Sequence, residues 1–383
     1  MKKILQVGSE NFGRGGRSVI TFELMYEMFQ SYQIDFLSTR QIESCLQVDY
    51  IESHGGKVQL CVENPKYGRI RREIDRVYKL YSIFSKEQYD LVHINADHAW
   101  EVLKTLLVAK LTKTQNIVVH AHATSYSLSS SSWKNKVKNS LILLSRLFIN
   151  RLNILKLACS SEAAKFMFGS DSDIHIINNG IDMTKYLLVD SDRRHALRKE
   201  LKIEEDTLVI GTVSRLEPEK NPLFLLDIAQ DISKYTSKFI MLIIGDGSLR
   251  EYFIDIKNEE LKNKVLFLGY REDIPQLLQI MDVFVLTSFK EGFGIVNIEA
   301  QAAGLPCVVS DGVPATVKVN DNFYFLSLAN GPERWAQKIL SLRNTRLTNY
   351  DVIKERISVA GFSIIDSRKE LKKLYEDYFH RNK

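Results

Sequence analysis

The sequence predicts an α/β protein of two doubly wound domains, with a boundary between residues 175 and 205. At 383 residues the chain exceeds what one ordinary core accommodates. Short β-branched runs alternate with longer amphipathic stretches, and runs that are apolar on both faces are typical of parallel sheets covered by helices. The polar segment 190–206 interrupts this alternation, and a new strand series begins after it.

The expected strands follow in chain order. Those of the first half are 4–9, 34–39, 57–62, 91–96, 116–123 and 155–161. Those of the second half are 175–180, 208–216, 239–247, 265–270, 283–288 and 306–311. Ligands of such sheets bind at the carboxyl ends of the strands, so we look for functional residues in the strand-to-helix loops.

Composition and charge narrow the functional classes. The chain is 45% hydrophobic and 26% charged, as in a globular protein, and its net charge is +5. Residues 1–170 carry 23 Lys and Arg against 15 acids, whereas the rest carries 29 against 32. The basic first half indicates an anionic partner. No aromatic-interleaved basic repeat, zinc pattern or recognition helix is present, so we expect no nucleic-acid partner.

Targeting signals are not expected. The segment MKKILQVGS is interpreted as a strand rather than a signal peptide, because its apolar run is short and lacks a cleavage site. The most apolar stretch, 141–158, is interrupted by Arg146, Arg151 and Lys156, so it is not expected to span a membrane. Four scattered cysteines without CxxC spacing favour a reducing, cytoplasmic location.

The first glycine-rich loop, 8–18, matches no standard nucleotide motif. Arg14 and Gly15 stand where a phosphate loop needs Lys and Ser or Thr, and no acid ends the next strand as in a dinucleotide fold. Gly15 and Gly16 would let backbone N–H groups approach an anion closely. The alternative is a turn that merely needs positive φ.

The segment GTVSRLEPEKNP, 211–222, places two cations after a strand. Arg215 and Lys220 project from a loop that is closed by Pro218 and Pro222. A planar guanidinium and a compact ammonium together suit a diphosphate. Solvated surface cations are the alternative.

The segment KEGFGIVNIEA, 290–300, places acids at both ends of a predicted helix start. The N–H groups of Gly294, Ile295 and Val296 would be unpaired there and would face an anion. Glu299 lies roughly 7.5 Å further along the helix axis, close to the offset between a diphosphate and a ribose. Glu291, before the helix, would then face a sugar beyond the phosphates. The two acids are therefore predicted to bracket a nucleotide-sugar.

Together these segments resemble family 4 of the glycosyltransferases, particularly its bacterial exopolysaccharide and capsule members. The matching pieces are the Gly-Gly loop, LVHIN, VVHAHATSY, IINNGID, GTVSRLEPEKNP, LLIIGDGSLR, VLFLGYREDI, MDVFVLTSFKEGFGIVNIEAQAAGLPCVVSD and a C-terminal helical tail. They cover nearly the whole chain in the expected order. The resemblance implies the GT-B fold, in which two Rossmann-like domains face each other across a cleft. It places an acceptor domain at 1–175, a nucleotide-sugar domain at 176–362, and a helix at 363–383 that packs back onto the first.

The resemblance also implies residue roles. Glu299 would bind the ribose, Glu291 the donor sugar, and Arg215 with Lys220 the diphosphate. His120 would lie beside the donor sugar. Further donor contacts are implied for the following residues: Gly15, Gly16, Tyr270, Gly292, Phe293, Gly294, Ile295 and Val296. Relatives usually carry an acid two residues after the paired glycines, whereas Ser18 stands here.

The histidines and acidic triplets do not predict a metal site. His93 is expected to be a satisfied core residue, and His120 and His122 are predicted to lie on opposite faces of their strand, with His120 toward the ligand. Because no third ligand has suitable spacing, metal binding by this pair is not expected. The Asp-Ser-Asp triplets 171–173 and 190–192 are interpreted as turns. We therefore expect no cofactor and no divalent metal.

The basic segments 66–79 and 133–152 allow two interpretations. Each suits a solvated helix face. Together they also suit peripheral docking on an anionic membrane at the inner face of the cell membrane, where a lipid-linked acceptor would be reached.

The sequence thus predicts a retaining, metal-independent hexosyltransferase. Its donor would be a nucleotide-sugar, with UDP expected, and its acceptor a polyprenyl-diphosphate-linked or other saccharide. A GT-B epimerase or phosphorylase is one alternative. A catalytically silent, sugar-binding partner of a glycosyltransferase complex is another.

Overall fold

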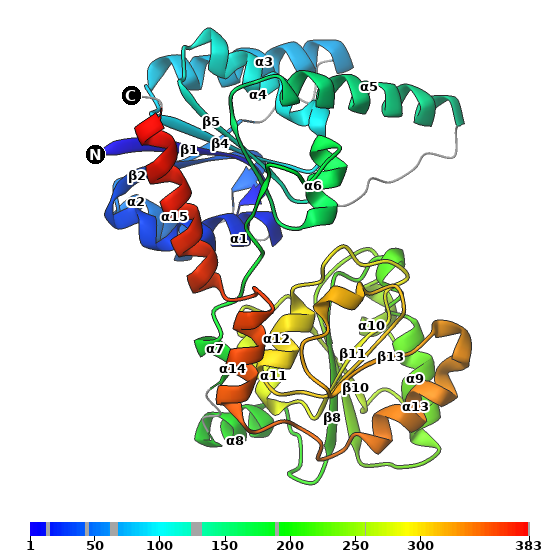
Figure 1. Cartoon of the computed structure of the whole chain (residues 1–383). Helices are drawn as coiled ribbons and strands as arrows, with labels where there is room; N and C mark the ends of the chain where they lie inside the picture. Colours follow the sequence, from blue (N-terminus) through cyan, green and yellow to red (C-terminus); the bar gives the residue numbers. More distant parts are fainter. Residues whose placement is uncertain are drawn as a thin grey trace. The chain divides into compact units, whose positions relative to one another are not determined.

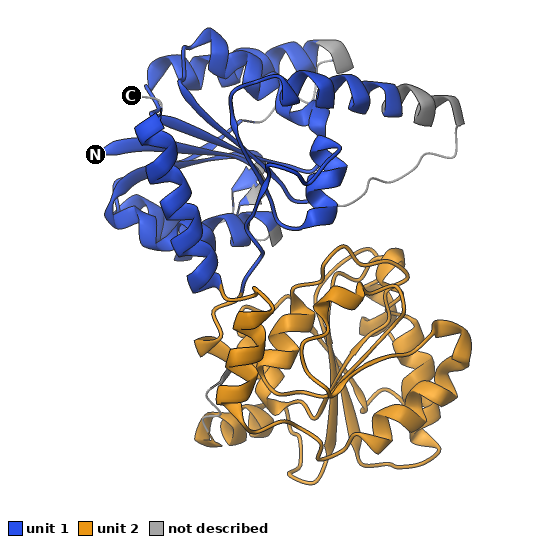
Figure 2. Cartoon of the chain, viewed as in Figure 1, with its two compact units in different colours: residues 1–180, 364–383 blue, residues 181–363 orange. Residues whose placement is uncertain are grey.

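The computed structural model describes residues 1–12, 16–42, 46–61, 68–123, 132–187, 191–256 and 258–381. The chain forms two compact units (Figure 2). The first unit combines residues 1–180 with 364–383, and the second consists of residues 181–363. The sequence had placed the corresponding divisions after residues 175 and 362.

The first unit is built on a parallel sheet in the order β3-β2-β1-β4-β5-β6-β7. Its strands are β1 (Lys2–Phe12), β2 (Tyr32–Ile42), β3 (Val58–Leu60), β4 (Leu91–Ala96), β5 (Asn116–Ala121), β6 (Leu155–Ala158) and β7 (His175–Ile176). The strand order changes direction between β1 and β4, which makes that pair the switch point of the sheet.

Alternating side chains of these strands supply two separate cores. On one face, Leu5 and Val92 pack with α3 (Arg69–Lys86), α4 (Ala99–Leu111), α5 (Ser132–Asn150) and α6 (Ser161–Phe168). On the other face, Ile4 and Leu91 pack with α1 (Gly16–Met25), the 3₁₀ helix η1 (Tyr26–Gln30), α2 (Leu46–Ser53) and α15 (Ile364–Arg381). Figure 1 shows the two helical layers on either side of the strands. This alternation is the period of two expected for a sheet that is covered on both faces.

The C-terminal helix α15 is an integral part of the first unit. It packs beside α1, where Arg368 forms an ion pair with Glu23 at 2.6 Å. The Tyr375 hydroxyl is fully buried and hydrogen-bonds with His93 on β4 and with Gln6 on β1. The last helix therefore closes one face of the sheet with both apolar and polar contacts.

The second unit contains a parallel sheet in the order β10-β9-β8-β11-β12-β13. Its strands are β8 (Leu208–Val213), β9 (Phe239–Ile244), β10 (Val265–Gly269), β11 (Val283–Leu286), β12 (Cys307–Val309) and β13 (Phe323–Phe325). Here the order changes direction between β8 and β11. The loops that follow these two strands therefore flank the switch point.

Helices cover both faces of the second sheet. One face packs against α7 (Thr184–Leu187), α8 (Ser191–Glu200), α11 (Ile274–Ile280), α12 (Val296–Ala302) and α14 (Tyr350–Val359). The other packs against α9 (Phe224–Ser233), α10 (Glu251–Ile254) and α13 (Gly331–Ser341). Short 3₁₀ turns follow three of the strands: η2 (Pro218–Lys220), η3 (Ala315–Val317) and η4 (Leu328–Asn330).

The predicted α/β class with two doubly wound sheets is confirmed, with two strand-level corrections. The segment 175–180 was assigned to the second half, but its strand β7 pairs with β6 at the edge of the first sheet. Strand β13 was missed; its three residues are too few to give a readable pattern, and it is positioned by pairing with β12.

Candidate functional site

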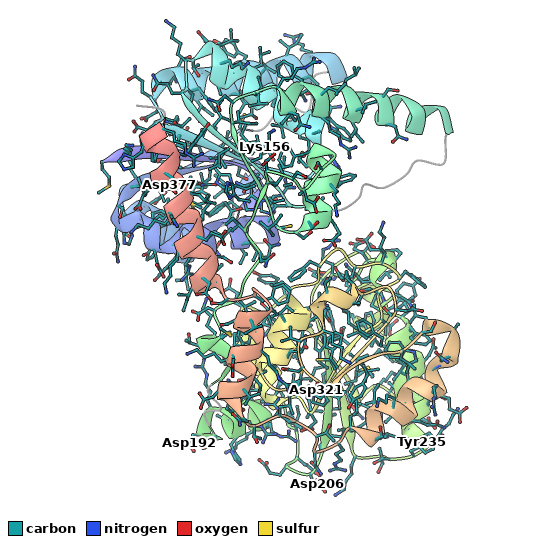
Figure 3. The ribbon with its side chains drawn as sticks, viewed as in Figure 1. Lys156, Asp192, Asp206, Tyr235, Asp321 and Asp377 are labelled. Atoms are coloured by element: carbon teal, nitrogen blue, oxygen red, sulfur yellow. The ribbon has the colours of Figure 1, made fainter. Side chains whose placement is uncertain are left out.

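The candidate site lies at the carboxyl ends of β8 and β11 in the second unit. Figure 3 labels Asp206, two residues before β8, which marks the amino end of the same sheet. Lys220 follows β8 and Glu291 follows β11, so the two residues approach the switch point from opposite sides. The topology alone brings these distant parts of the sequence together.

Lys220 and Glu291 form the central contact of the site. The Lys220 ammonium donates to both carboxylate oxygens of Glu291 at 2.8 Å. The side chains are only 12% and 13% exposed. Ser288, fully buried at the end of β11, adds a longer hydrogen bond to the same carboxylate at 3.3 Å. A mostly buried ammonium and carboxylate are thus held in one fixed arrangement.

Local backbone constraints set the position of Glu291. Its N–H donates to the carbonyl of Gly312 at 2.9 Å. Gly294 has φ +66°, and a Cβ there would lie 2.7 Å from Glu291 Cγ, so the chain needs glycine at this turn. The loop before α12 is therefore shaped to keep the glutamate beside Lys220.

The loop that carries Lys220 is held from two sides. Thr287, directly after β11, donates its hydroxyl to the carbonyl of Asn221 at 2.9 Å. On the other side, Gly245 has φ +132°, and a Cβ there would lie 1.8 Å from the Ser214 carbonyl oxygen. Ser248 donates to the Glu217 carboxylate through its hydroxyl at 2.7 Å. The loops after β8, β9 and β11 thus support one another.

Glu299 occupies the first turn of α12 and contacts α7. The Tyr186 hydroxyl donates to Glu299 Oε1 at 2.8 Å. Burial raises the pKa of the Glu299 carboxyl above its usual value, while the Tyr186 hydrogen bond and the charge of Lys185 oppose that shift. The carboxylate therefore has a partner on one oxygen within a largely apolar environment.

Arg215 is not part of the central contact. Its guanidinium forms an ion pair with Glu219 at 2.6 Å within the same loop, and the two side chains are 68% and 55% exposed. Among the described residues it makes no hydrogen bond or ion pair with Lys220 or Glu291. Of the two predicted diphosphate-binding cations, Lys220 is thus mostly buried and Arg215 is exposed.

The remaining predicted donor contacts lie at the start of α12, except Tyr270, which follows β10. Gly292 and Tyr270 are exposed. The Phe293 ring packs against Phe362 at 5.1 Å between centroids, and the side chains of Ile295 and Val296 pack partly against the core. Among the described residues, the N–H groups of Gly294, Ile295 and Val296 donate to no backbone carbonyl. The side chains of Phe293, Ile295 and Val296 therefore anchor this turn, while its N–H groups have no backbone acceptor.

In the first unit, the glycine loop after β1 is only partly described. Gly15 lies outside the described residues, and α1 begins at Gly16. Arg17 forms an ion pair with Asp97, which follows β4, at 2.7 Å. Gly8 has φ +107°, and a Cβ there would lie 1.9 Å from the Asn95 carbonyl oxygen. The switch point of the first sheet is thus also bridged by a cation and an acid.

His120 is fully buried on β5, in contact with two other histidines. Its ring lies 4.2 Å from that of His122 and 5.3 Å from that of His93, measured between centroids. The prediction that His120 and His122 occupy opposite faces is wrong, because residues two positions apart on a strand share a face. Burial lowers the pKa of His120 to about 3, partly offset by the Ile177 backbone. His120 is therefore neutral at physiological pH, and its role beside a donor sugar stays a prediction.

The acidic triplets are structurally unlike each other. Asp171 accepts a hydrogen bond from Ser161 and forms an ion pair with Lys165 at 3.1 Å. Asp190 lies outside the described residues, and Ser191 with Asp192 begins α8 instead of a turn. Across the described ranges, no three His, Cys, Asp or Glu side chains gather in a metal-binding arrangement.

Comparisons with known proteins agree with this fold. A family model described as Glycosyltransferase Family 4 matches residues 16–185, and one described as Glycosyl transferases group 1 matches residues 193–357. The putative glycosyltransferase EpsF of Bacillus subtilis is 30% identical, covering 94% of this chain and 93% of its own length.

Two further matches extend the comparison. The Escherichia coli UDP-Gal:alpha-D-GlcNAc-diphosphoundecaprenol alpha-1,3-galactosyltransferase is 28% identical, with 80% of each chain covered. The solved structure of Anabaena Alr3699/HepE, in complex with UDP and glucose, has a TM-score of 0.74 at 20% identity. That match covers 98% of this chain and 100% of the other, and it shows the fold.

The family matches identify the chain as a glycosyltransferase, and its two parallel sheets have the GT-B fold. The chain belongs to glycosyltransferase family 4.

Sequence reasoning missed several residues that shape the site. Ser288 and Thr287 end a predicted strand, and their position alone suggested no role. Tyr186 follows the segment IINNGID, yet nothing in its local pattern indicates a contact with a residue 113 positions later. Such long-range contacts depend on the path of the chain, so no local signal could have identified them.

We expect Lys220 and Glu291 to be energetically coupled. Lys220→Met or Glu291→Gln should each reduce the free energy of unfolding by about 1–3 kcal/mol. Each substitution leaves the mostly buried charge of the other residue without its partner. The double variant should cost less than the two single costs combined, by a coupling energy of about 0.5–3 kcal/mol. Urea unfolding of the four proteins measures this coupling.

The exposed pair Arg215–Glu219 provides the matched control. Its coupling energy, from Arg215→Met and Glu219→Gln, should stay below about 1 kcal/mol because solvent screens exposed ion pairs. Additive effects at Lys220 and Glu291 would contradict the arrangement described here.

Proposed function

We propose that the protein transfers a hexose or N-acetylhexosamine from a UDP-sugar to a polyprenyl-diphosphate-linked or other saccharide acceptor in cell-surface polysaccharide biosynthesis. The single observation that carries the proposal is the contact between Lys220 and Glu291, set at the switch point with Glu299 on the helix that follows. In a nucleotide-sugar the diphosphate joins the ribose to the sugar. The proposal assigns the diphosphate to Lys220, the sugar to Glu291 and the ribose to Glu299.

The relatives support the donor and acceptor classes. The Escherichia coli relative is named for a UDP-galactose donor and a diphosphoundecaprenol-linked acceptor, and the Anabaena structure contains UDP and glucose. Among the relatives described above, EpsF has the highest sequence identity, 30% over 94% of this chain, and it is named a putative glycosyltransferase. A UDP-sugar and a lipid-linked saccharide are therefore the substrates to test first.

The proposed chemistry uses the charges at the switch point. When the donor binds, the Lys220 ammonium would turn from Glu291 to the diphosphate and stabilise the negative charge that develops on the leaving UDP. Glu291, freed from Lys220, would accept hydrogen bonds from the donor sugar and orient it. The bond from the anomeric carbon to the UDP oxygen breaks, and the acceptor oxygen forms the new bond as its proton passes to the phosphate oxygen of the leaving UDP. Attack from the face that UDP leaves would retain the configuration.

Arg215 would contribute as a second phosphate ligand. Its exposed position and its pairing with an equally exposed glutamate make it easy to redirect, because little burial holds it in place. The two cations would supply the positive charge that a divalent metal provides in other phosphate sites. Metal independence is therefore part of the proposal.

Binding of the nucleotide is the first test. UDP should bind more tightly than GDP or ADP, and Glu299→Ala should weaken UDP binding by about 1–3 kcal/mol through loss of hydrogen bonds from the ribose to a charged group. Isothermal titration calorimetry measures both effects. A tenfold preference for GDP or ADP would reject uridine, and unchanged affinity in Glu299→Ala would remove this residue from the ribose.

Turnover tests the chemistry. With a UDP-α-sugar and a lipid-linked saccharide, we expect an α-linked product and activity that persists in EDTA. Lys220→Ala should lower turnover far more than it weakens acceptor binding, because its charge acts on the leaving group. The anomeric proton signal of the product identifies the linkage. A β linkage contradicts retention, activity restored only by manganese contradicts metal independence, and neither transfer nor donor hydrolysis would favour a silent binding partner.

We also propose a peripheral contact between the first unit and an anionic membrane. Neighbouring helices α4 and α5 leave large apolar side chains exposed to solvent. We call this set the α4–α5 patch: Leu107, Leu111, Leu141, Leu143, Leu144, Leu147 and Phe148. The Lys110 ammonium lies 5.5 Å from the centre of the Phe148 ring, which links the two helices across the patch.

Charge around the patch favours a lipid surface as its partner. Residues 99–156 contain nine Lys and Arg and one acid, Glu101. Exposed leucines beside basic residues suit the boundary between anionic headgroups and acyl chains. No helix of the described residues is long and apolar enough to cross a membrane. The patch would instead lie on the surface from which a lipid-linked acceptor projects.

Vesicle sedimentation tests this contact. The protein should sediment with vesicles of phosphatidylcholine and phosphatidylglycerol, less with phosphatidylcholine alone, and less in high salt because screening weakens the attraction. The variant Leu144→Ser/Leu147→Ser should bind several-fold more weakly. The control Tyr252→Ser/Val359→Ser removes equally exposed apolar side chains from the second unit and should bind normally. Equal binding by both variants would contradict the α4–α5 patch as the docking surface.

A further inference from the structure

Tyr186 contributes a buried hydroxyl to the surroundings of Glu299. Tyr186 lies on the four-residue helix α7 and is only 6% exposed, with its ring in the same core that supports α11, α12 and α14. Its hydroxyl donates to Glu299 Oε1 at 2.8 Å, between residues 113 positions apart. The ring is thus fixed by packing, and the hydroxyl is directed at one carboxylate oxygen.

This contact settles how Glu299 can act. A carboxylate on the first turn of a helix can adopt several rotamers, and a hydrogen bond from a rigid partner restricts it to one. With Oε1 occupied by Tyr186, Oε2 stays available to an external donor. The hydroxyl and the nearby Lys185 also favour the ionised form of Glu299 against the opposing effect of burial.

We propose that Tyr186 is a positioning residue, which holds Glu299 so that its free carboxylate oxygen accepts hydrogen bonds from the vicinal hydroxyls of a ribose. This inference rests on the proposed function, since it assigns the ribose of the nucleotide to Glu299. Tyr186 does not belong to the loops at the switch point, because it lies on α7 and contacts Glu299 from there. A phenylalanine at this position would keep the packing and lose only the hydroxyl.

The experiment compares two ligands that differ only in the ribose hydroxyls. UDP and 2′,3′-dideoxyuridine diphosphate are titrated into the wild-type protein and Tyr186→Phe by calorimetry. We expect Tyr186→Phe to weaken UDP binding about three- to tenfold, the usual effect of one hydrogen bond that orders a charged group. Binding of the dideoxy ligand should be unchanged, which also shows that the variant retains a folded site. In a Glu299→Ala background, Tyr186→Phe should have no further effect on UDP.

Tyr235→Phe is the matched control. The Tyr235 hydroxyl also donates to a carboxylate, that of Glu333 on α13. Helix α13 packs on the opposite face of the second sheet, and Figure 3 labels Tyr235. This variant should bind both ligands normally.

Three outcomes would overturn the inference. Unchanged or tighter UDP binding in Tyr186→Phe would mean that the hydroxyl does not prepare Glu299 for the ribose. Equal losses for the two ligands would mean that the tyrosine has a purely structural role. If the wild-type protein binds no UDP, the proposed function itself fails, together with the inference that depends on it.

Discussion

The ion pair between Lys220 and Glu291 is the constraint on which the rest of the site depends. It joins the loops after β8 and β11, which are neighbours only because the strand order reverses there. Buried Ser288, the turn at Gly294 and the hydrogen bond from Thr287 all serve to hold these two loops at one separation. The scaffold therefore keeps the two charges together at the switch point, and each side chain satisfies the charge of the other.

The two units share one structural principle with different residues. Each sheet reverses its strand order once, and a cation meets an acid at each reversal: Lys220 with Glu291 in one unit and Arg17 with Asp97 in the other. In both units a glycine with positive φ lets backbone segments approach closely at the same edge. The surroundings differ in polarity, since the first unit adds a cluster of buried, neutral histidines that the second unit lacks among its described residues.

Much of this architecture could be predicted from the sequence because its signals are local. Apolar runs such as 208–213 and 283–286 report burial on both faces, and the acids at Glu291 and Glu299 are recognisable by their spacing around a helix start. Contacts that depend on the chain's path were beyond this reasoning. The partner of Glu299 on α7 and the separation of Arg215 from Lys220 both required three-dimensional positions. The shared face of His120 and His122, by contrast, follows from the two-residue period of a strand, so it was predictable from the sequence.

The return of α15 to the first unit links folding to the order of synthesis. The first sheet keeps one apolar face incomplete until residues 364–381 have been made, because Ile364, Leu371 and Tyr375 belong to its core. All residues of the second unit precede that helix in the chain. The second unit is therefore synthesised in full before the first has all of its core residues, whereas domains usually fold in N-terminal-first order. Until then His93 and Gln6 lack the Tyr375 hydroxyl, so the core of the first unit stays incomplete until the eighteen residues of α15 are added.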